Sequence, residues 1–347
     1  MSVRSDAVLR VVSAGPGTTL QDAGRHGYLR YGVTAAGPMD PLAHATANLA
    51  VGNGSGATAI EVALGGIEVS AEGGSLAVAV AGGDFAISLD GRLLPSGAVL
   101  LTIEPGAILK IRAGRGGAWC YLAIAGRFLV PQVLGSHATH TRTGFGGLEG
   151  RAISAGDHLR VERRHVSLPP LGRIAAPWLD RPTGVIRVIL GPQNDYFTDE
   201  QISAFRNGPW SVSTKADRMA FFLDGPQLTH AKGFNIVSDG IAMGAIQVPG
   251  NGQPIVLMAD RQSTGGYPKI ATVIGPDLGR LAQTRAGMKF RFEVVSIAQA
   301  VAARREQAAA LAGNIIVEPL VRTRLSSEFL LSLNLIDGVV ADCDFRC

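Results

Sequence analysis

Short aliphatic runs, separated by glycine-rich turns, recur along most of the chain. The 347 residues include 45 glycines without the three-residue period of collagen, which indicates many tight turns. Closely spaced runs of this kind predict the strands of a barrel or a sandwich. The runs cover residues 8–13, 59–64, 76–80, 85–89, 99–103, 108–111 and 119–124, and then 185–190, 245–248, 255–258, 270–274 and 289–295.

A proline-rich stretch, residues 168–182, separates the two series of runs. A turn glycine followed by alternating apolar and polar residues occurs on both sides of it, at Gly106, Gly156 and Gly287. This repetition favours two related β-units. We predict an N-terminal unit over residues 1–175, a C-terminal unit over 176–296, and a helix with a C-terminal segment over 297–347.

Helices are expected to be few. Asp40 is a candidate N-cap followed by proline for a helix over residues 40–50, and Thr198 is a candidate cap for a helix over 198–205. An alanine-rich run over residues 297–311 predicts a third helix. The predicted fold class is therefore mainly β with a few short helices.

Composition and charge exclude several classes of protein. Hydrophobic residues make up 46% of the chain and charged residues 17%, which excludes intrinsic disorder. The net charge of +4 is spread over scattered residues, whereas nucleic-acid binding needs a basic stripe, so no nucleic-acid partner is expected. No N-terminal segment resembles a signal peptide, and the longest apolar stretch, residues 118–125, is too short to cross a bilayer. We expect a cytoplasmic protein without a membrane partner, and reduced thiols at Cys120, Cys343 and Cys347.

The common catalytic motifs are absent from the sequence. It has no phosphate-binding loop ending in Gly-Lys-Ser/Thr, no dinucleotide fingerprint, no metalloprotease helix and no Gly-x-Ser-x-Gly elbow. His137 and His140 have a spacing that could hold a metal, but no cysteine or carboxylate lies close to them in the sequence, which favours a surface loop over a metal site. Lys289 follows a methionine, as in a biotin-attachment turn, yet it begins an alternating strand and is not expected to carry biotin.

Two clusters of polar residues lie in loops and at strand ends, where functional sites are usually built. The first cluster consists of Gln21, Asp22, Arg25, Asp40, Asn48, Asn53 and Glu61. The second lies within about thirty residues and consists of Asp239, Gln247, Asp260, Arg261, Thr264, Tyr267 and Lys269. A structural alternative is that the Asp-Gly pairs only form turns and that both arginines pair with neighbouring carboxylates.

The same stretches carry a family resemblance. Residues 17–28, with the sequence Gly-Thr-Thr-Leu-Gln-Asp-Ala-Gly-Arg-His-Gly-Tyr, resemble the N-terminal signature of the family that contains allophanate hydrolase subunit 2 and the C-type subunit of 5-oxoprolinase, as do 37–40 and 47–53. Residues 238–249 and 252–270 resemble its second signature. The resemblance covers roughly residues 8–295, and the segment 334–340 is similar to the family's closing segment. The chain departs from the pattern at Phe222, where the family more often has arginine.

The resemblance implies a fold of two cyclophilin-like β-barrel units, similar to half of the carboxyltransferase region of urea carboxylase. It also implies a sister subunit, similar to allophanate hydrolase subunit 1 or to the B-type subunit of 5-oxoprolinase, and a further protein of the A type. The leading expectation is an ATP-dependent 5-oxoprolinase that converts 5-oxoproline to glutamate, with the ATP used by the complex on a partner chain. No biotin-carboxylase or biotin-carrier segment is present in the 347 residues, which favours this function.

Two alternatives remain open at this point. One is a carboxyltransferase subunit of a urea carboxylase/allophanate hydrolase-type system, in which biotin is carried by another chain. The other is a non-catalytic regulator that binds a kinase inhibitor.

We also assign expected roles to the polar residues. Arg25 and Arg261 are expected to clamp an anion, with Asp22, Asp239 or Asp260 orienting them or handling protons. Tyr267 and Lys269 are expected to donate to a developing oxyanion. The expected substrate-binding residues are Gln21, Asp40, Asn48, Asn53, Glu61, Gln247 and Thr264, and no metal ligand is expected.

Overall fold

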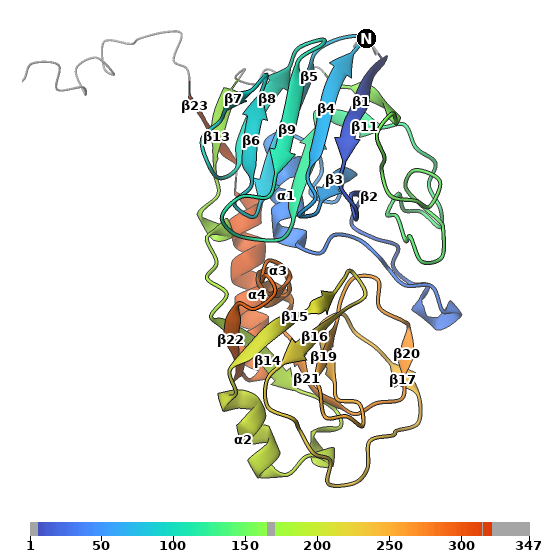
Figure 1. Cartoon of the computed structure of the whole chain (residues 1–347), viewed down its shortest axis with the longest axis vertical. Coiled ribbons are helices and arrows are strands. Elements are labelled where there is room, and N and C mark those ends of the chain that lie inside the picture. The colour runs from blue at the N-terminus through green and yellow to red at the C-terminus, as the bar shows by residue number, and fades with distance from the viewer. Residues whose placement is uncertain (1–5, 165–170, 314, 321–347) are drawn as a thin grey trace, which may run out of the picture.

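The computed structural model describes residues 6–164, 171–313 and 315–320. Strands hold 37% of the residues and helices 17%, so the prediction of a mainly β chain is confirmed. Figure 1 shows two lobes stacked along the long axis of the molecule, one from each half of the chain. The predicted closing segment 334–340, Cys343 and Cys347 lie outside the described residues.

Two seven-stranded sheets form the N-terminal lobe. Leu9 and Val69 of one sheet and Val78 and Leu122 of the other are fully buried in one hydrophobic cluster, so the sheets enclose a common core. The first sheet has the order β11 (Gly126–Phe128), β12 (His158–Arg163), β1 (Asp6–Ala14), β4 (Ile67–Glu72), β9 (Ile108–Arg112), β6 (Ala86–Leu89) and β7 (Arg92–Leu93). The second has the order β2 (Thr19–Gln21), β3 (Ala59–Val62), β10 (Cys120–Ile124), β5 (Leu76–Gly82), β8 (Val99–Ile103), β13 (Leu171–Ala175) and β23 (Ile316–Pro319).

The C-terminal lobe is a closed barrel. Its core contains an aromatic group in which Phe205 stacks on Phe292, with ring centroids 4.6 Å apart, and Trp210 packs beside both rings. A two-stranded sheet of β17 (Asp239–Gly240) and β20 (Thr264–Gly265) lies beside the barrel. The barrel order is β14 (Val185–Leu190), β21 (Lys269–Val273), β18 (Ala245–Gln247), β19 (Ile255–Leu257), β16 (Ala220–Asp224), β15 (Trp210–Ala216) and β22 (Lys289–Val294).

The capped helices form where the sequence predicts them. Asp40 accepts a hydrogen bond from the Ala43 amide and caps α1 (Pro41–Ala50), and Thr198 caps α2 (Asp199–Asn207) in the same way. Ser296 begins α4 (Ile297–Ala312) with a capping box. The sequence did not predict α3 (Gly275–Ala282), which has glycines at residues 275 and 279 and no side-chain cap. Short 3-10 turns form at η1 (Leu29–Tyr31), η2 (Pro177–Leu179) and η3 (Asn194–Tyr196).

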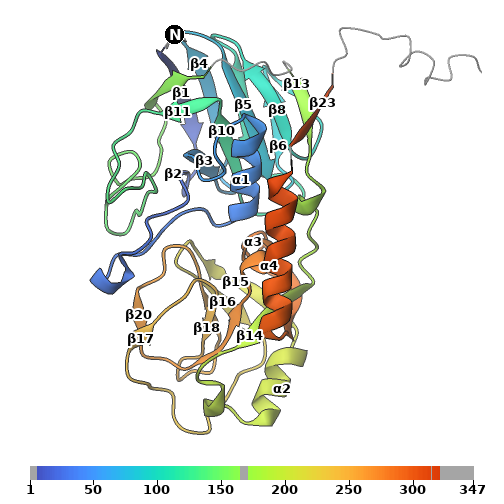
Figure 2. The same cartoon turned by 180° about the vertical axis from the view of Figure 1, so that it is seen from behind.

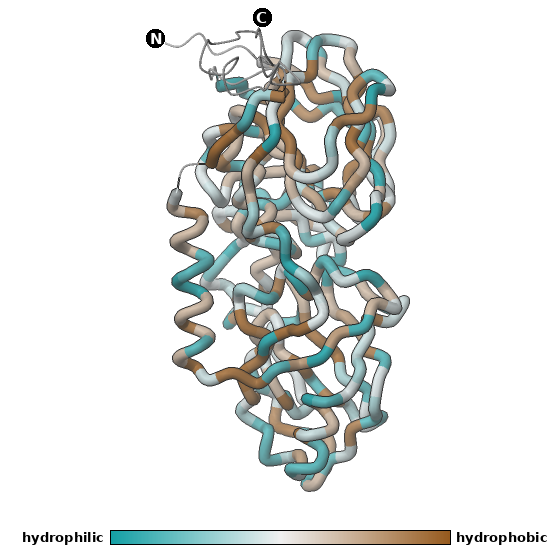
Figure 3. The backbone as a smooth tube through the Cα atoms, turned by 90° about the vertical axis from the view of Figure 1, so that its left-hand side faces the viewer, coloured by the Kyte–Doolittle hydropathy of each residue, from teal (hydrophilic) through white to brown (hydrophobic). Residues whose placement is uncertain are grey.

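The C-terminal part of the described chain returns to the first lobe. Helix α4 runs along one side of the molecule past both lobes (Figure 2), and β23 then pairs with β13 at the edge of the second sheet. Figure 3 shows hydrophilic and hydrophobic residues mixed along α4, and Ala303 is its one buried residue. Strand β13 itself lies inside the proline-rich stretch that was expected to interrupt the strands. The division into units at residues 175/176 and 296/297 stays a prediction.

No helix in the described part of the chain is both long enough and apolar enough to cross a membrane.

Candidate functional site

Arg25 is held in the loop that follows β2. Its Nη2 donates to the carbonyl oxygen of Ala138, and its guanidinium lies 4.6 Å from the centre of the Phe145 ring. The residue is only 2% exposed. Within the described residues, its Nη1 is buried without a hydrogen-bond partner. A buried guanidinium with a free donor is suited to receive an anionic ligand.

Arg261 is fixed just after β19. Its Nε donates to the carbonyl oxygen of Ile241 at 3.0 Å and its Nη1 to that of Met258 at 3.4 Å. Arg261 is 6% exposed, so it is a buried residue. Burial lowers the pKa of both Arg25 and Arg261, and the nearby carboxylate of Asp260 opposes this shift.

The two arginines line one cavity of about 370 Å³, which we call the Arg25–Arg261 cavity. His44 of α1 also lines it. Burial lowers the pKa of His44 to about 4, so this ring is neutral at neutral pH. Its Nε2 lies 3.2 Å from the Gln21 carbonyl oxygen and 3.3 Å from the Asn48 amide nitrogen. The positive charge of the cavity therefore comes from the arginines.

Asp22 positions the loop that holds Arg25. Its Oδ1 accepts hydrogen bonds from the Gly24 amide and the Ser136 hydroxyl, at 2.9 and 2.6 Å, and its Oδ2 accepts from the His137 amide at 2.6 Å. These bonds fix the segment whose Ala138 carbonyl accepts from Arg25. Asp22 thus acts on the arginine through the backbone.

Arg218 links the two lobes through a buried ion network. Its guanidinium donates two hydrogen bonds to Asp260, at 2.8 and 2.9 Å, and a third to the Glu61 carboxylate from the first lobe. Tyr121 also donates to Glu61, at 2.8 Å. Although burial opposes it, the charges of Glu61 and Asp260 raise the pKa of Arg218. Glu61 and Asp260 are therefore both engaged in holding the lobes together.

Asp40 makes a second connection between the lobes. Its Oδ2 accepts from Arg181 Nη2 at 2.6 Å and from Gln283 Nε2 at 2.9 Å. Gln283 also accepts from the amide of Trp119 and donates to its carbonyl. Since Asp40 is fully buried, the structure places it in the packing between the lobes.

Three other residues of the first cluster bind the backbone of the first lobe. Gln21 donates to the Thr139 carbonyl at 3.0 Å and accepts from the Gly37 amide at 3.2 Å. Asn48 donates to the Ala57 carbonyl at 2.8 Å. Asn53 donates to the Ile124 carbonyl at 2.7 Å. These amides fix loop conformations near the Arg25–Arg261 cavity.

Residues of the second cluster meet at one end of the barrel. Lys269 Nζ donates to Asp239 Oδ2 at 2.9 Å, and this bond lowers the pKa of Asp239. Gln247, Tyr267 and Phe222 line a pocket of about 630 Å³, which we call the barrel-end pocket. Tyr267 is 41% exposed, so its ring faces both pocket and solvent.

Residues 31–294 match the model of the family described as carboxyltransferase domain, subdomain A and B. The chain belongs to the carboxyltransferase domain family.

Relatives of this carboxyltransferase-family chain include enzyme subunits of similar length. It is 37% identical to the C-type subunit of 5-oxoprolinase from Escherichia coli, over 86% of this chain and 95% of that protein. It is also 37% identical to the corresponding 5-oxoprolinase subunit from Haemophilus influenzae, over 83% of this chain and 91% of that protein. The crystal structure of Kluyveromyces lactis urea carboxylase matches with a TM-score of 0.80 and 28% identity, covering 90% of this chain and 29% of that chain. The chain thus corresponds to less than a third of the urea carboxylase.

In this carboxyltransferase-family chain, some of the predicted site residues lie together and others lie apart. Arg25 and Arg261, which are far apart in sequence, share a cavity, whereas Tyr267 and Gln247 line a different one. Thr264 is exposed on β20 and pairs with Gly240 of β17, the residue after Asp239. Within the described ranges, no group of three or more histidine, cysteine, aspartate and glutamate side chains could hold a metal ion.

Sequence reasoning missed Arg218 and His44. The signal for Arg218 was present, because it lies four residues before Phe222, where the chain departs from its family pattern. His44 gave no such signal, since a histidine inside an alanine-rich helix has no characteristic spacing.

Proposed function

We propose that this chain is the C-type component of an ATP-dependent 5-oxoprolinase, which opens the lactam of 5-oxoproline to give glutamate. Identity of 37% to the C-type subunits of two bacterial 5-oxoprolinases, across almost their whole length, supports this proposal. The structural observation that carries it is the Arg25–Arg261 cavity, with a buried guanidinium donor left free on Arg25 among the described residues.

The proposed ligand of the cavity is the substrate carboxylate. Guanidinium groups bind carboxylates through parallel hydrogen bonds, and burial strengthens such bonds by excluding water. Because His44 is neutral, the buried positive charge on the cavity wall belongs to the two arginines. The carboxylate is common to 5-oxoproline and glutamate, so the cavity would hold the molecule through ring opening.

The barrel-end pocket combines apolar, polar and charged groups. Its wall includes the Gln247 amide, the Tyr267 phenol and the Phe222 ring, together with Arg142, Asp217 and Lys215. Arg142 pairs with Asp217, and the charge of nearby Lys269 is compensated by Asp239. We assign to Tyr267 and Lys269 the role of donors to an amide oxygen that becomes negative during reaction. Phe222 makes this pocket more apolar than the arginine common in the family would.

We place ATP on a partner chain. In this complex ATP hydrolysis supplies the driving free energy for ring opening, and this chain binds and orients the amide substrate. The proposed partners are a sister chain of the B type and a further protein of the A type.

Carboxyl transfer to a urea-type substrate is the second candidate function. The observation that favours it is the structural similarity to urea carboxylase, with a TM-score of 0.80. In that case biotin would be carried by another chain, and the Arg25–Arg261 cavity would hold the carboxyl group to be transferred.

Substrate competition in a reconstituted complex tests the proposal. The chain is combined with its sister subunits and assayed for ATP hydrolysis with 5-oxoproline, and separately for carboxylation of urea by a carrier loaded with carboxybiotin. We expect hydrolysis that depends on 5-oxoproline and yields glutamate. Turnover with urea and carboxybiotin alone would establish the second function, and tight assembly without turnover of either substrate would indicate a regulator.

A further inference from the structure

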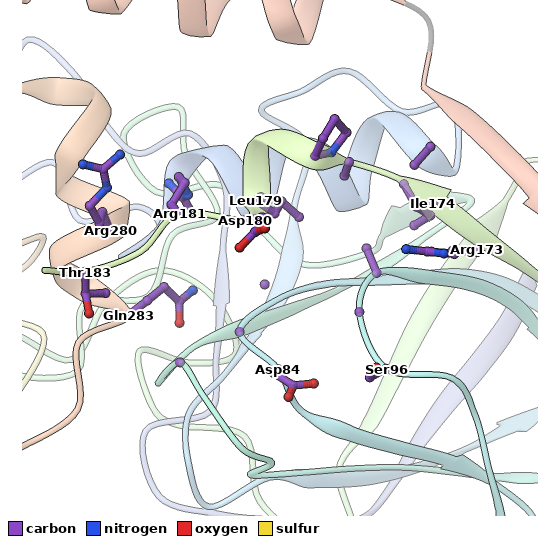
Figure 4. A pocket seen from close by; sticks show the side chains of 18 of the residues that line it. Asp84, Ser96, Arg173, Ile174, Leu179, Asp180, Arg181, Thr183, Arg280 and Gln283 are labelled. Carbon is purple, nitrogen blue, oxygen red and sulfur yellow. The ribbon is translucent and has the colours of Figure 1, made fainter. Parts of the chain in front are cut away.

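A second cavity with arginines in its wall lies between the lobes, away from the Arg25–Arg261 cavity. It has a volume of about 780 Å³ and is lined by the segment 173–183 that connects the lobes, by α3 and by loops of the first lobe. We call it the linker cavity. Figure 4 shows Arg181, Arg280, Gln283 and Thr183 gathered along one part of its wall.

Arg181 reaches this wall with most of its hydrogen-bonding capacity unused. Its Nη2 donates to Asp40, and its side chain is 11% exposed. Its Nε and Nη1 are both buried and have no partner in the residues that the structure describes. Gly279 lets α3 pack closely against this ion pair, because a Cβ atom there would lie 2.8 Å from Arg181 Nη1 and 2.2 Å from Asp40 Oδ1.

Arg280 of α3 is also incompletely paired. Its Nη1 donates to the Val185 carbonyl at 3.1 Å and lies 3.5 Å from Asp277 Oδ2. Its Nε is buried without a partner anywhere in the described ranges. Asp277 accepts its shortest hydrogen bonds from Arg187, at 2.7 Å from the side chain and 2.8 Å from the backbone. The Asp277 carboxylate therefore pairs more closely with Arg187 than with Arg280.

The ion pairs of this network join more guanidinium groups than carboxylates. Three guanidinium groups, Arg181, Arg187 and Arg280, share the two buried carboxylates of Asp40 and Asp277. The carboxylates on the cavity wall are Asp84, Asp180 and Glu318, and none of them forms an ion pair with Arg181 or Arg280 in the described structure. They therefore leave the unpartnered nitrogens of these two arginines unsatisfied.

We infer that the linker cavity binds a small oxyanion, a phosphate or a carboxylate, between Arg181 and Arg280. Each buried donor without a partner costs about 1–3 kcal/mol, and an oxyanion offers several acceptors to satisfy three such nitrogens. Arginine is the side chain whose planar donors match both carboxylate and phosphate. Because the ligand would touch the connecting segment and α3 together, its binding stabilises the arrangement of the two lobes.

Calorimetric titration of the full chain with inorganic phosphate tests this site directly. We expect one phosphate bound per chain, and an unfolding midpoint raised by about 3 °C at a phosphate concentration tenfold above the dissociation constant. Titration with acetate at equal ionic strength distinguishes a carboxylate ligand from a phosphate ligand. Only binding that Arg280→Met abolishes is assigned to the linker cavity, because the Arg25–Arg261 cavity is also proposed to bind a carboxylate. Failure of both anions to bind, or binding that persists unchanged in Arg280→Met, would overturn the inference.

Two variants separate this site from general salt effects. Phosphate also stabilises proteins by exclusion from their surface, which affects all variants equally. Arg280→Met should lose the phosphate-dependent shift. The control Arg206→Met should keep it, because Arg206 is exposed in the last turn of α2 and does not line the cavity. Equal shifts in both variants would contradict the site.

A substitution at the entrance of the linker cavity tests the inference if Arg280→Met does not fold. Arg173 is exposed on β13 and lines the same cavity, so Arg173→Glu leaves the core intact and places a negative charge at the entrance. We expect a several-fold weaker phosphate affinity by calorimetry. An unchanged affinity would argue against binding in this cavity. Because the readout is binding, the result is independent of 5-oxoprolinase activity.

Discussion

Arg261 is the residue in which structural and functional roles are easiest to separate by measurement. Arg261→Ala removes one of two guanidinium groups from the Arg25–Arg261 cavity and takes the side-chain donor from the Ile241 carbonyl, whereas the Met258 carbonyl keeps the backbone amide of residue 261. We expect turnover of the reconstituted complex to fall on the order of a hundredfold, as when one transition-state donor is lost. We also expect the free energy of unfolding to fall by about 1–3 kcal/mol.

Arg206→Ala is the matched control, because Arg206 is exposed in the last turn of α2. It should change neither rate nor stability appreciably. Wild-type turnover in folded, complex-forming Arg261→Ala would show that Arg261 only supports the backbone.

His44 makes stability depend on pH. Its pKa is about 4 in the folded chain and about 6.5 when unfolded, so protonation favours the unfolded state. The stability contributed by the neutral ring is complete above pH 6.5 and is lost as the pH falls towards 4. Between pH 7.5 and 5 we expect a loss of about 2 kcal/mol in urea unfolding, which His44→Gln should lack. Parallel pH profiles for both proteins would contradict this assignment.

At the scale of elements, α4 ties the second lobe back to the first. Ala303 is its buried contact and packs with Ile274 and Val295. Ala303→Glu should bury a charge there and lower the free energy of unfolding by about 1–3 kcal/mol. The neighbouring Ala302→Glu should have little effect because residue 302 is exposed. Hydrogen exchange should report faster exchange in α4 and β23 in the first variant only, and equal exchange in both would refute this role.

Strands and capped helices were the elements that the sequence predicted best. The runs 99–103 and 185–190 coincide with β8 and β14, because aliphatic and β-branched residues bounded by turns determine a strand locally. Helix α3 was missed because its glycines weaken the helical pattern, and tertiary packing beneath α4 stabilises it instead. Strand β13 was missed because it pairs with β23, over a hundred residues away.

The site was predictable only in part, because some of its partners are also far apart in the sequence. The composition of the loops indicated Arg25 and Arg261, and the structure places them in one cavity. Loop composition could not indicate that Glu61 pairs with Arg218, which is 157 residues away. Spacing along the chain contains no information on such a partner, so a carboxylate of the ion network was assigned to substrate binding.

At the scale of the whole molecule, the Glu61–Arg218–Asp260 network holds the lobes together. Arg218→Met would leave two buried carboxylates without their counter-ion, which typically costs about 3–5 kcal/mol. We expect a large drop in the urea midpoint, partly restored by adding Glu61→Gln, which removes one of the unpaired charges. A double variant no more stable than Arg218→Met would contradict coupling between these residues.

The central claim is that the chain works as one component of a 5-oxoprolinase complex. The most direct measurement compares 5-oxoproline-dependent ATP hydrolysis by the chain alone, by its sister subunits alone and by the mixture. We predict turnover by the mixture and none by either part. Robust turnover by the isolated chain, or by the sister subunits without it, would contradict the claim.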